Sequence, residues 1–81
     1  MQVRVLAFAA VREVLERSEL VLELPEGARV ADAWDALVRD FPGLHDVEAS
    51  TRIACNARVA AGEVRLADGD ELALLPPLGG G

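Results

Sequence analysis

A single amphipathic segment limits what this chain can fold into, because no other stretch has the apolar spacing of a substantial helix. Five apolar side chains recur at helical intervals and predict one buried stripe of about three turns: Val30, Trp34, Leu37, Val38 and Phe41. Pro42-Gly43 ends the predicted helix. We expect Trp34 to be a core residue, and the surface that packs against this helix must come from strands.

Short strands are predicted on both sides of this helix. Five segments have a suitable composition: residues 2–8, 19–24, 52–56, 58–60 and 71–75. We expect the first two to pair as a hairpin, with a short helix between them that ends near Ser18. Residues 44–50 are predicted to be a loop or an irregular turn, and residues 63–66 a short extended or helical-turn segment. A tight turn at residues 68–70 leads into the last strand.

The order of these elements predicts the fold class. A strand, a short helix, a strand, the main helix and then three short strands give an α+β domain in which a mixed sheet packs on one helix. That is the arrangement of a β-grasp. The chain has 81 residues, enough for one small domain. We therefore predict a β-grasp domain over residues 1–75, followed by a flexible tail over residues 76–81.

Composition and charge narrow the classes of partner. The chain is 52% hydrophobic, which is too apolar for a disordered protein. Charged residues interrupt the apolar stretches, so none of them is long enough to span a membrane. The apolar run from Val5 to Ala10 is too short for a signal sequence, so we expect a cytoplasmic protein. A net charge of −6 disfavours nucleic acid and favours a protein partner with a basic face.

Few side chains offer chemistry of their own. His45 is the only histidine, and no serine or cysteine motif accompanies it as a catalytic triad requires. Cys55 is the only cysteine, which excludes an internal disulfide and a site built on several thiolates; we expect a small core thiol. Asp68-Gly69-Asp70 is typical of a turn, since a calcium loop needs more oxygen ligands. We predict no metal site.

The C-terminal segment is the most unusual feature of the chain: Pro76-Pro77-Leu78-Gly79-Gly80-Gly81. Prolines stiffen the exit from the last strand and cannot donate hydrogen bonds to a sheet. Glycines make a thread without side chains that fits a narrow pocket, and the segment can extend at most about 20 Å. A frayed domain end can have the same composition, so these residues alone leave both interpretations open.

Three motifs together resemble the small subunit of molybdopterin synthase: Phe8-Ala9-x-Val11-Arg12-Glu13, Asp68-Gly69-Asp70-Glu71 and the segment from Pro76 to Gly81. The resemblance covers essentially the whole chain. Two positions depart from the family pattern. Gly79 stands where the family more often has a small polar residue, and Ala57 stands where a glycine is usual in an Asn-Gly turn. Neither residue takes part in the chemistry that the family implies.

The resemblance implies a ubiquitin-like sulfur carrier with no activity of its own. A ubiquitin-activating-like adenylyltransferase would adenylate the Gly81 carboxylate with ATP and magnesium, and a sulfurtransferase would supply the sulfur of a thiocarboxylate. Gly80 and Gly79 would let this end enter the large catalytic subunit. There the sulfur would pass to cyclic pyranopterin monophosphate to form the dithiolene of molybdopterin. The carrier would bind no cofactor, and the complex would be a heterotetramer of two small and two large subunits.

The resemblance also implies an interface with the large subunit. It assigns Phe8, Arg12 and Leu75 to this surface, with Val59 as a weaker candidate. A docking surface is usually an apolar patch rimmed by charge. The residues alone leave open whether Phe8 and Leu75 belong to the core instead.

Three other functions stay open at this point. A carrier for thiamin or for tRNA thiolation would share the diglycine end, a ubiquitin-like modifier would join Gly81 to a target lysine, and a plain interaction module would have an inert tail. All eight basic residues are arginine. A codon bias toward arginine, alanine and glycine would account for the absence of lysine. The alternative is that this absence protects an activated C-terminal acyl group from capture by neighbouring amines.

Overall fold

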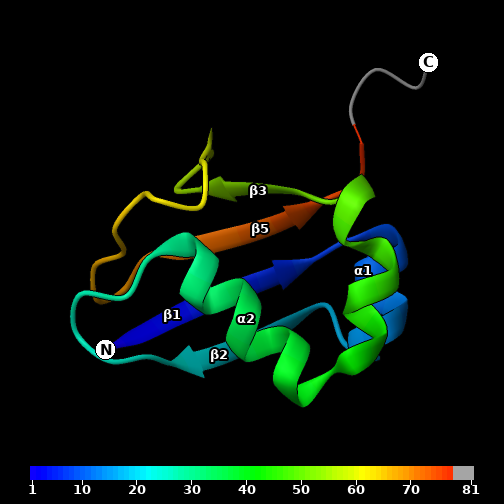
Figure 1. Ribbon diagram of the computed structural model, residues 1–81, viewed down its shortest axis with the longest axis horizontal. Helices are drawn as coiled ribbons and strands as arrows, with labels where there is room; N and C mark the ends of the chain where they lie inside the picture. Colours follow the sequence, from blue (N-terminus) through cyan, green and yellow to red (C-terminus); the bar gives the residue numbers. More distant parts are fainter. Residues whose placement is uncertain (78–81) are drawn as a thin grey trace.

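The computed structural model describes residues 1–77, and its elements follow the predicted order (Figure 1). Its strands are β1 (Gln2–Ala7), β2 (Glu19–Glu23), β3 (Arg52–Cys55), β4 (Arg58–Val59) and β5 (Glu71–Leu75). Its helices are α1 (Ala9–Leu15), α2 (Val30–Asp40) and the 3₁₀ helix η1 (Pro42–Ser50). The predicted α+β fold of the ubiquitin-like β-grasp type is confirmed.

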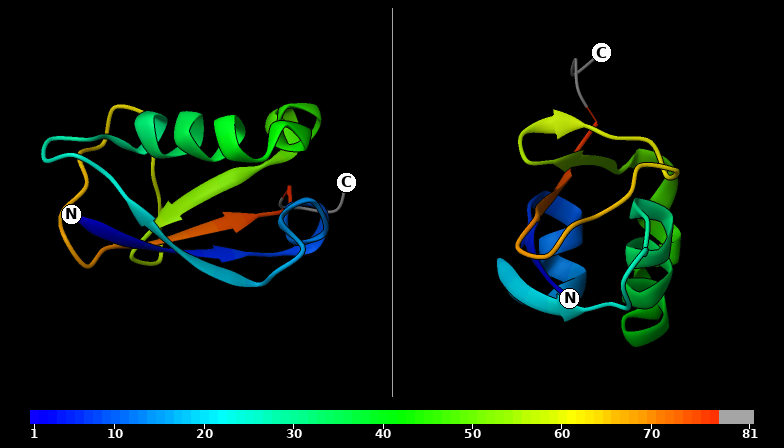
Figure 2. Two further views of the ribbon diagram at one scale, coloured as in Figure 1. Left: turned by 90° about the horizontal axis from the view of Figure 1, so that it is seen from below. Right: turned by 90° about the vertical axis from the view of Figure 1, so that its left-hand side faces the viewer.

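The strands form one mixed sheet in the order β2-β1-β5-β3-β4. β1 pairs antiparallel with β2, as the predicted hairpin requires, and parallel with β5. β3 pairs antiparallel with both β5 and β4. α2 lies across one face of this sheet, whereas α1 lies at its end (Figure 2). Within residues 1–77, no helix covers the opposite face of the sheet (Figure 2).

The core lies between the sheet and α2. The sheet supplies Val3, Val5, Leu22, Leu72 and Leu74, and α2 supplies Val30, Ala33, Trp34 and Leu37. Trp34 is 7% exposed, which confirms its predicted place in the core. Its Nε1 is buried and has no hydrogen-bond partner among the described residues. The packing therefore uses the indole mainly for its apolar surface.

The ends of both α-helices have local causes. α1 ends at Leu15 rather than near Ser18, because Glu16 adopts a left-handed conformation (φ 57°) and its N–H donates to the Arg12 carbonyl. α2 begins after Arg29, which has no capping side chain of its own. Instead the Arg29 N–H donates to Oδ2 of Asp32 at 2.8 Å, so a first-turn carboxylate does the capping from inside the helix.

One sequence-based prediction fails in the irregular segments. Residues 44–50 were predicted to be a loop or an irregular turn, but η1 spans Pro42–Ser50 and buries Leu44 completely. The prediction missed this helix because a 3₁₀ helix lacks the 3.6-residue period. The short extended or helical-turn segment predicted at residues 63–66 corresponds to a turn that ends at Glu63 and an isolated bridge between Arg65 and Arg29. The predicted strand at residues 52–56 ends at Cys55, since Asn56 already belongs to a turn.

Candidate functional site

The face of the sheet opposite α2 is the candidate site. Side chains alternate between the two faces of a strand, and paired residues point to the same face. Val5 and its partner Leu72 are buried against α2, so Arg4 and its partner Glu71 point to the open face. The same alternation assigns further outward residues along each strand: Gln2 and Leu6 on β1, Val21 on β2, Ala73 and Leu75 on β5.

One end of this open face carries an apolar patch, which we define as Leu6, Phe8, Val59, Ala73 and Leu75. Phe8 is 44% exposed and Val59 63% exposed, while the other three side chains are partly buried. Phe8 continues the outward alternation of β1, since its backbone is still extended (φ −132°). Leu75 ends β5, so the patch borders the point where the chain continues into Pro76 and Pro77.

The sequence-predicted interface residues do not all lie in this patch. Phe8 and Leu75 belong to it rather than to the core. Val59 pairs with Ala54, which pairs with Ala73, so the register turns Val59 to the open face; at this sheet edge Val59 also lines a hollow with Val30 and Trp34. Arg12 is exposed on α1 and lines a separate hollow of about 660 Å³ together with Glu19. The predicted reactive and insertion residues, Gly79 to Gly81, lie outside the described residues.

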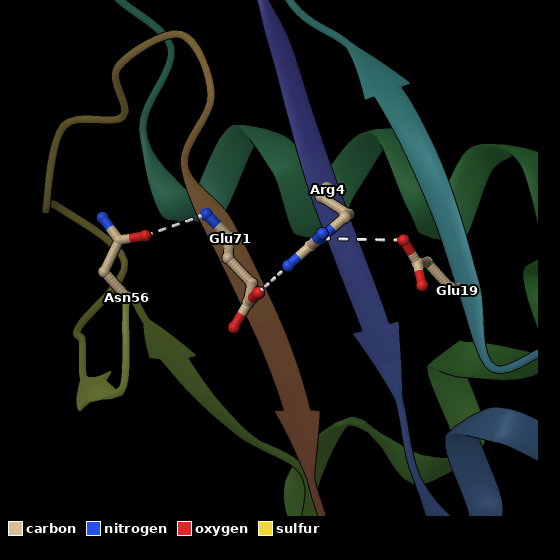
Figure 3. A network of polar contacts seen from close by, with 4 residues as sticks. All are labelled: Arg4, Glu19, Asn56 and Glu71. Atoms are coloured by element: carbon tan, nitrogen blue, oxygen red, sulfur yellow. Dashed lines mark hydrogen bonds and ion pairs between the residues drawn. The ribbon is translucent and has the colours of Figure 1, made fainter.

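The opposite end of the face is polar, and the sequence analysis missed it. Arg4 lies between two carboxylates from neighbouring strands (Figure 3). Its Nη2 donates to Oε2 of Glu71 on β5, and its Nε lies 3.6 Å from Oε2 of Glu19 on β2. The hydrogen bond and charge of Glu71, followed by the charge of Glu19, raise the pKa of Arg4. The outward positions of the alternating segment Gln2-Val3-Arg4-Val5 are the only sequence signal for this cluster.

A set of hydrogen bonds fixes the start of β5, and with it Glu71. Asn56 Oδ1 accepts from the Glu71 N–H at 3.0 Å (Figure 3), and the Asn56 N–H donates to the Glu71 carbonyl at 2.8 Å. Asp70 accepts from Nδ2 of Asn56 at 2.9 Å and from the Ala67 N–H at 2.8 Å. These two bonds lower the pKa of Asp70, and the bond from Ala67 has the larger effect.

The remaining candidate side chains lie apart from the open face. Cys55 is partly buried at the border of the core, and its Sγ lies 3.7 Å from Oδ2 of Asp70. Burial, and then the charge and hydrogen bond of Asp70, raise the pKa of this thiol, so it is a weak nucleophile. His45 is exposed on η1, with Nδ1 3.7 Å from Oε1 of Glu48.

Two further features of residues 1–77 bear on function. No group of three His, Cys, Asp or Glu side chains in this range is arranged to hold a metal ion. None of the helices in the same range has the length and apolar character needed to cross a membrane.

The chain is similar to known proteins over its whole length. The ThiS family model matches residues 5–81. The molybdopterin synthase sulfur carrier subunit of Arabidopsis thaliana is 34% identical over 80 residues, covering 99% of this chain and 83% of the relative. The subunit of the same name from Chlamydomonas reinhardtii is 37% identical over 83 residues, covering 100% of both chains.

The chain is also similar to solved structures over its whole length. SAMP1 from Haloferax volcanii has a TM-score of 0.89 to this chain at 31% identity, with 100% of both chains covered. A protein–protein complex of subunits 1 and 2 of molybdopterin-converting factor from Helicobacter pylori contains a chain with a TM-score of 0.69 at 26% identity, again with 100% of both chains covered.

Proposed function

The chain belongs to the ThiS family, and we propose that it is the sulfur carrier subunit of molybdopterin synthase, with a thiocarboxylate at Gly81 as the sulfur donor. The observation that carries this proposal is the family match, which runs to Gly81 and so includes the glycine end. The apolar patch at the end of β5 supports it, because it gives a partner a docking surface beside that segment.

The chemistry starts from a poor acyl donor. A carboxylate at Gly81 attacks the α-phosphate of ATP, pyrophosphate leaves, and the acyl carbon now carries AMP as a good leaving group. A persulfide of the sulfurtransferase then expels AMP and forms an acyl disulfide. A thiol cleaves the S–S bond, which releases the thiocarboxylate and leaves the two remaining sulfurs as a disulfide. The activating enzyme supplies the magnesium and the catalytic groups, and a sulfurtransferase supplies the sulfur. The need for ATP favours the cytoplasm as the location.

The described residues of this chain provide the docking surface and lead the C-terminal segment out of the sheet beside it. β5 ends at Leu75, and Pro76 and Pro77 have no N–H to donate, so the sheet ladder cannot continue along the chain. A partner that covers the apolar patch therefore meets the chain where it leaves the sheet. The Helicobacter pylori complex of subunits 1 and 2 supports a large subunit as that partner. The sulfur acceptor that we propose there is cyclic pyranopterin monophosphate.

Intact-mass spectrometry of the protein purified from its own cells tests the thiocarboxylate. We expect a species heavier by about 16 Da, the difference between sulfur and oxygen, that disappears when Gly81 is deleted. Deletion of Gly80 and Gly81 is expected to abolish sulfur transfer and leave the melting temperature unchanged. If only the unmodified mass is found after incubation with an activating enzyme, ATP and a sulfur source, the sulfur carrier proposal is wrong.

A binding measurement tests the docking surface. Val59→Ser in the apolar patch is expected to weaken the complex with the large subunit about tenfold, the effect of losing a buried apolar contact at an interface. Val64→Ser is the matched control, since Val64 is also an exposed valine (39%) but lies in the segment before β5 rather than on β4. Equal affinities of the two variants would place the docking surface elsewhere.

A protein modifier is the second candidate, because of the TM-score of 0.89 to SAMP1, a small archaeal modifier protein. In that case the activated Gly81 acyl group would pass to a lysine of another protein. Isopeptide-linked conjugates in cell lysate that depend on Gly81 would favour this function. A carrier for thiamin or tRNA thiolation would give the same thiocarboxylate mass, and only the sulfur acceptor would differ.

A further inference from the structure

The polar end of the open face has an excess of negative charge. We define the acidic corner as Glu19, Glu23 and Glu71 together with Arg4. The register turns all three carboxylates to the same face, and the Arg4 guanidinium contacts two of them, Glu71 and Glu19. Neighbours hold two of them in place: Arg4 binds Glu71, and Nε2 of Gln2 donates to Oε1 of Glu23 at 2.8 Å.

The acidic corner borders a hollow on the open face. The hollow has a volume of about 400 Å³, and the side chains of Arg4, Val21, Asn56 and Glu71 contribute to its wall. Val21 is 59% exposed, so an apolar surface beside the carboxylates is available for the stem of a long side chain. A lysine or arginine has both parts that fit: an apolar stem and a cationic head.

The acidic corner is continuous with the apolar patch. Glu19 is paired with Leu6 of the patch across β1 and β2, and Glu71 precedes Ala73 on the same side of β5. At the far end of the patch, Arg52 is paired with Leu75 and points to the same face. The open face is therefore polarised across the sheet, with Glu19 and Glu23 on the β2 edge and the Arg52 guanidinium on β3, beside the exit of the chain.

We infer that the acidic corner receives a basic side chain of the large subunit and so sets the orientation in which the two proteins dock. The inference rests on the sulfur carrier function proposed above. An apolar patch attracts a partner without directing it, whereas complementary charges fix the register and raise the association rate. Only one orientation brings the segment after Leu75 to the catalytic pocket, so a directional contact away from that segment serves the transfer.

The association rate constant with the purified large subunit from the same organism tests this inference. In stopped-flow experiments at low salt, Glu19→Gln and Glu23→Gln are each expected to lower the rate constant about threefold, the factor for unit charges roughly 6 Å apart in water. High salt is expected to abolish the difference. Asp35→Asn is the matched control, because it removes one exposed carboxylate from α2, in the other layer, and is expected to leave the rate constant nearly unchanged.

The possible results separate this inference from the proposed function. If the large subunit binds and all three variants behave alike, the polarised docking is wrong and the sulfur carrier function is unaffected. If the wild-type chain does not bind the large subunit at all, both fail. Salt-dependent self-association that Glu19→Gln abolishes would assign the acidic corner to a second copy of the chain, and would equally overturn the inference.

Discussion

Replacing Ala57 with glycine is expected to stabilise the protein, because Ala57 has a backbone conformation that suits glycine. Asn56 and Ala57 form the two-residue connection between β3 and β4, and their φ angles are 49° and 71°. Two central residues with positive φ are the requirement of a type I′ hairpin turn, for which Asn-Gly is the preferred sequence. Asparagine tolerates this conformation, whereas alanine does so only with strain.

The size of the effect follows from two opposing terms. A left-handed conformation costs an L-residue about 1–2 kcal/mol, which glycine avoids. Glycine loses more conformational freedom on folding, which costs about 0.5–1 kcal/mol. The Ala57→Gly variant should therefore gain about 0.5–1 kcal/mol in free energy of unfolding. For a domain of this size the gain corresponds to a rise of about 2–8 °C in melting temperature.

Urea unfolding followed by tryptophan fluorescence measures this gain, since Trp34 is the only tryptophan and is buried in the core. The midpoint is expected to rise with an unchanged m-value. Ala61→Gly is the control: Ala61 is also an exposed loop alanine, but its φ is not positive, so the same substitution should destabilise. If both variants lower the midpoint, strain at Ala57 is not the cause.

Two further predictions follow from the polar contacts of Asp70, and a third from the pairing of Arg52 with Leu75. The pKa of Asp70 is lowered from its ordinary 3.8, so its ionised form stabilises the fold above about pH 4. This stability is lost as the pH falls through the lowered pKa. In thermal unfolding, the melting temperature of Asp70→Asn should therefore fall less between pH 7 and pH 3 than that of the wild type. The same variant should speed alkylation of Cys55 at pH 8, because Asp70 helps to raise the pKa of the thiol; an unchanged rate would leave burial as the sole cause. Arg52→Lys sets an amine opposite Leu75, and on activation of Gly81 it should give an amide with release of AMP, detected as a species one water lighter than the free chain. Arg65→Lys is the control, because Arg65 pairs with Arg29 and not with a residue of β5. It should give less of this product, and equal amounts would remove the support for a protective absence of lysine.

The sequence predicted the parts of the fold that depend on local periodicity. The stripe from Val30 to Phe41 specified α2, and alternation specified the strands, because burial on one side repeats every 3.6 or 2 residues. It did not predict η1, whose apolar residues have neither period. It also could not place Glu16 in a left-handed conformation, since nothing in its side chain requires this.

The acidic corner could not be predicted, because it depends on register between distant segments. Glu19 and Glu71 reach Arg4 only through the pairing of β1 with β2 on one side and with β5 on the other. A shift of one residue in either pairing would turn these side chains to opposite faces. Local sequence shows that each of the three is polar and outward, but not that they meet.

The apolar patch has a feature in the sequence that a simple alternation of polar and apolar residues does not predict. Along β1 the outward residues change from Gln2 and Arg4 to Leu6 and Phe8, and along β5 from Glu71 to Leu75. Packing on α2 needs only the inward residues to be apolar, so outward apolar residues serve no purpose in the core. Because β1 and β5 are parallel, their two changes coincide at one end of the sheet, and the outward apolar side chains gather beside the point where the chain leaves it. The loss of alternation along two parallel strands is therefore the sequence feature that corresponds to the docking surface proposed above.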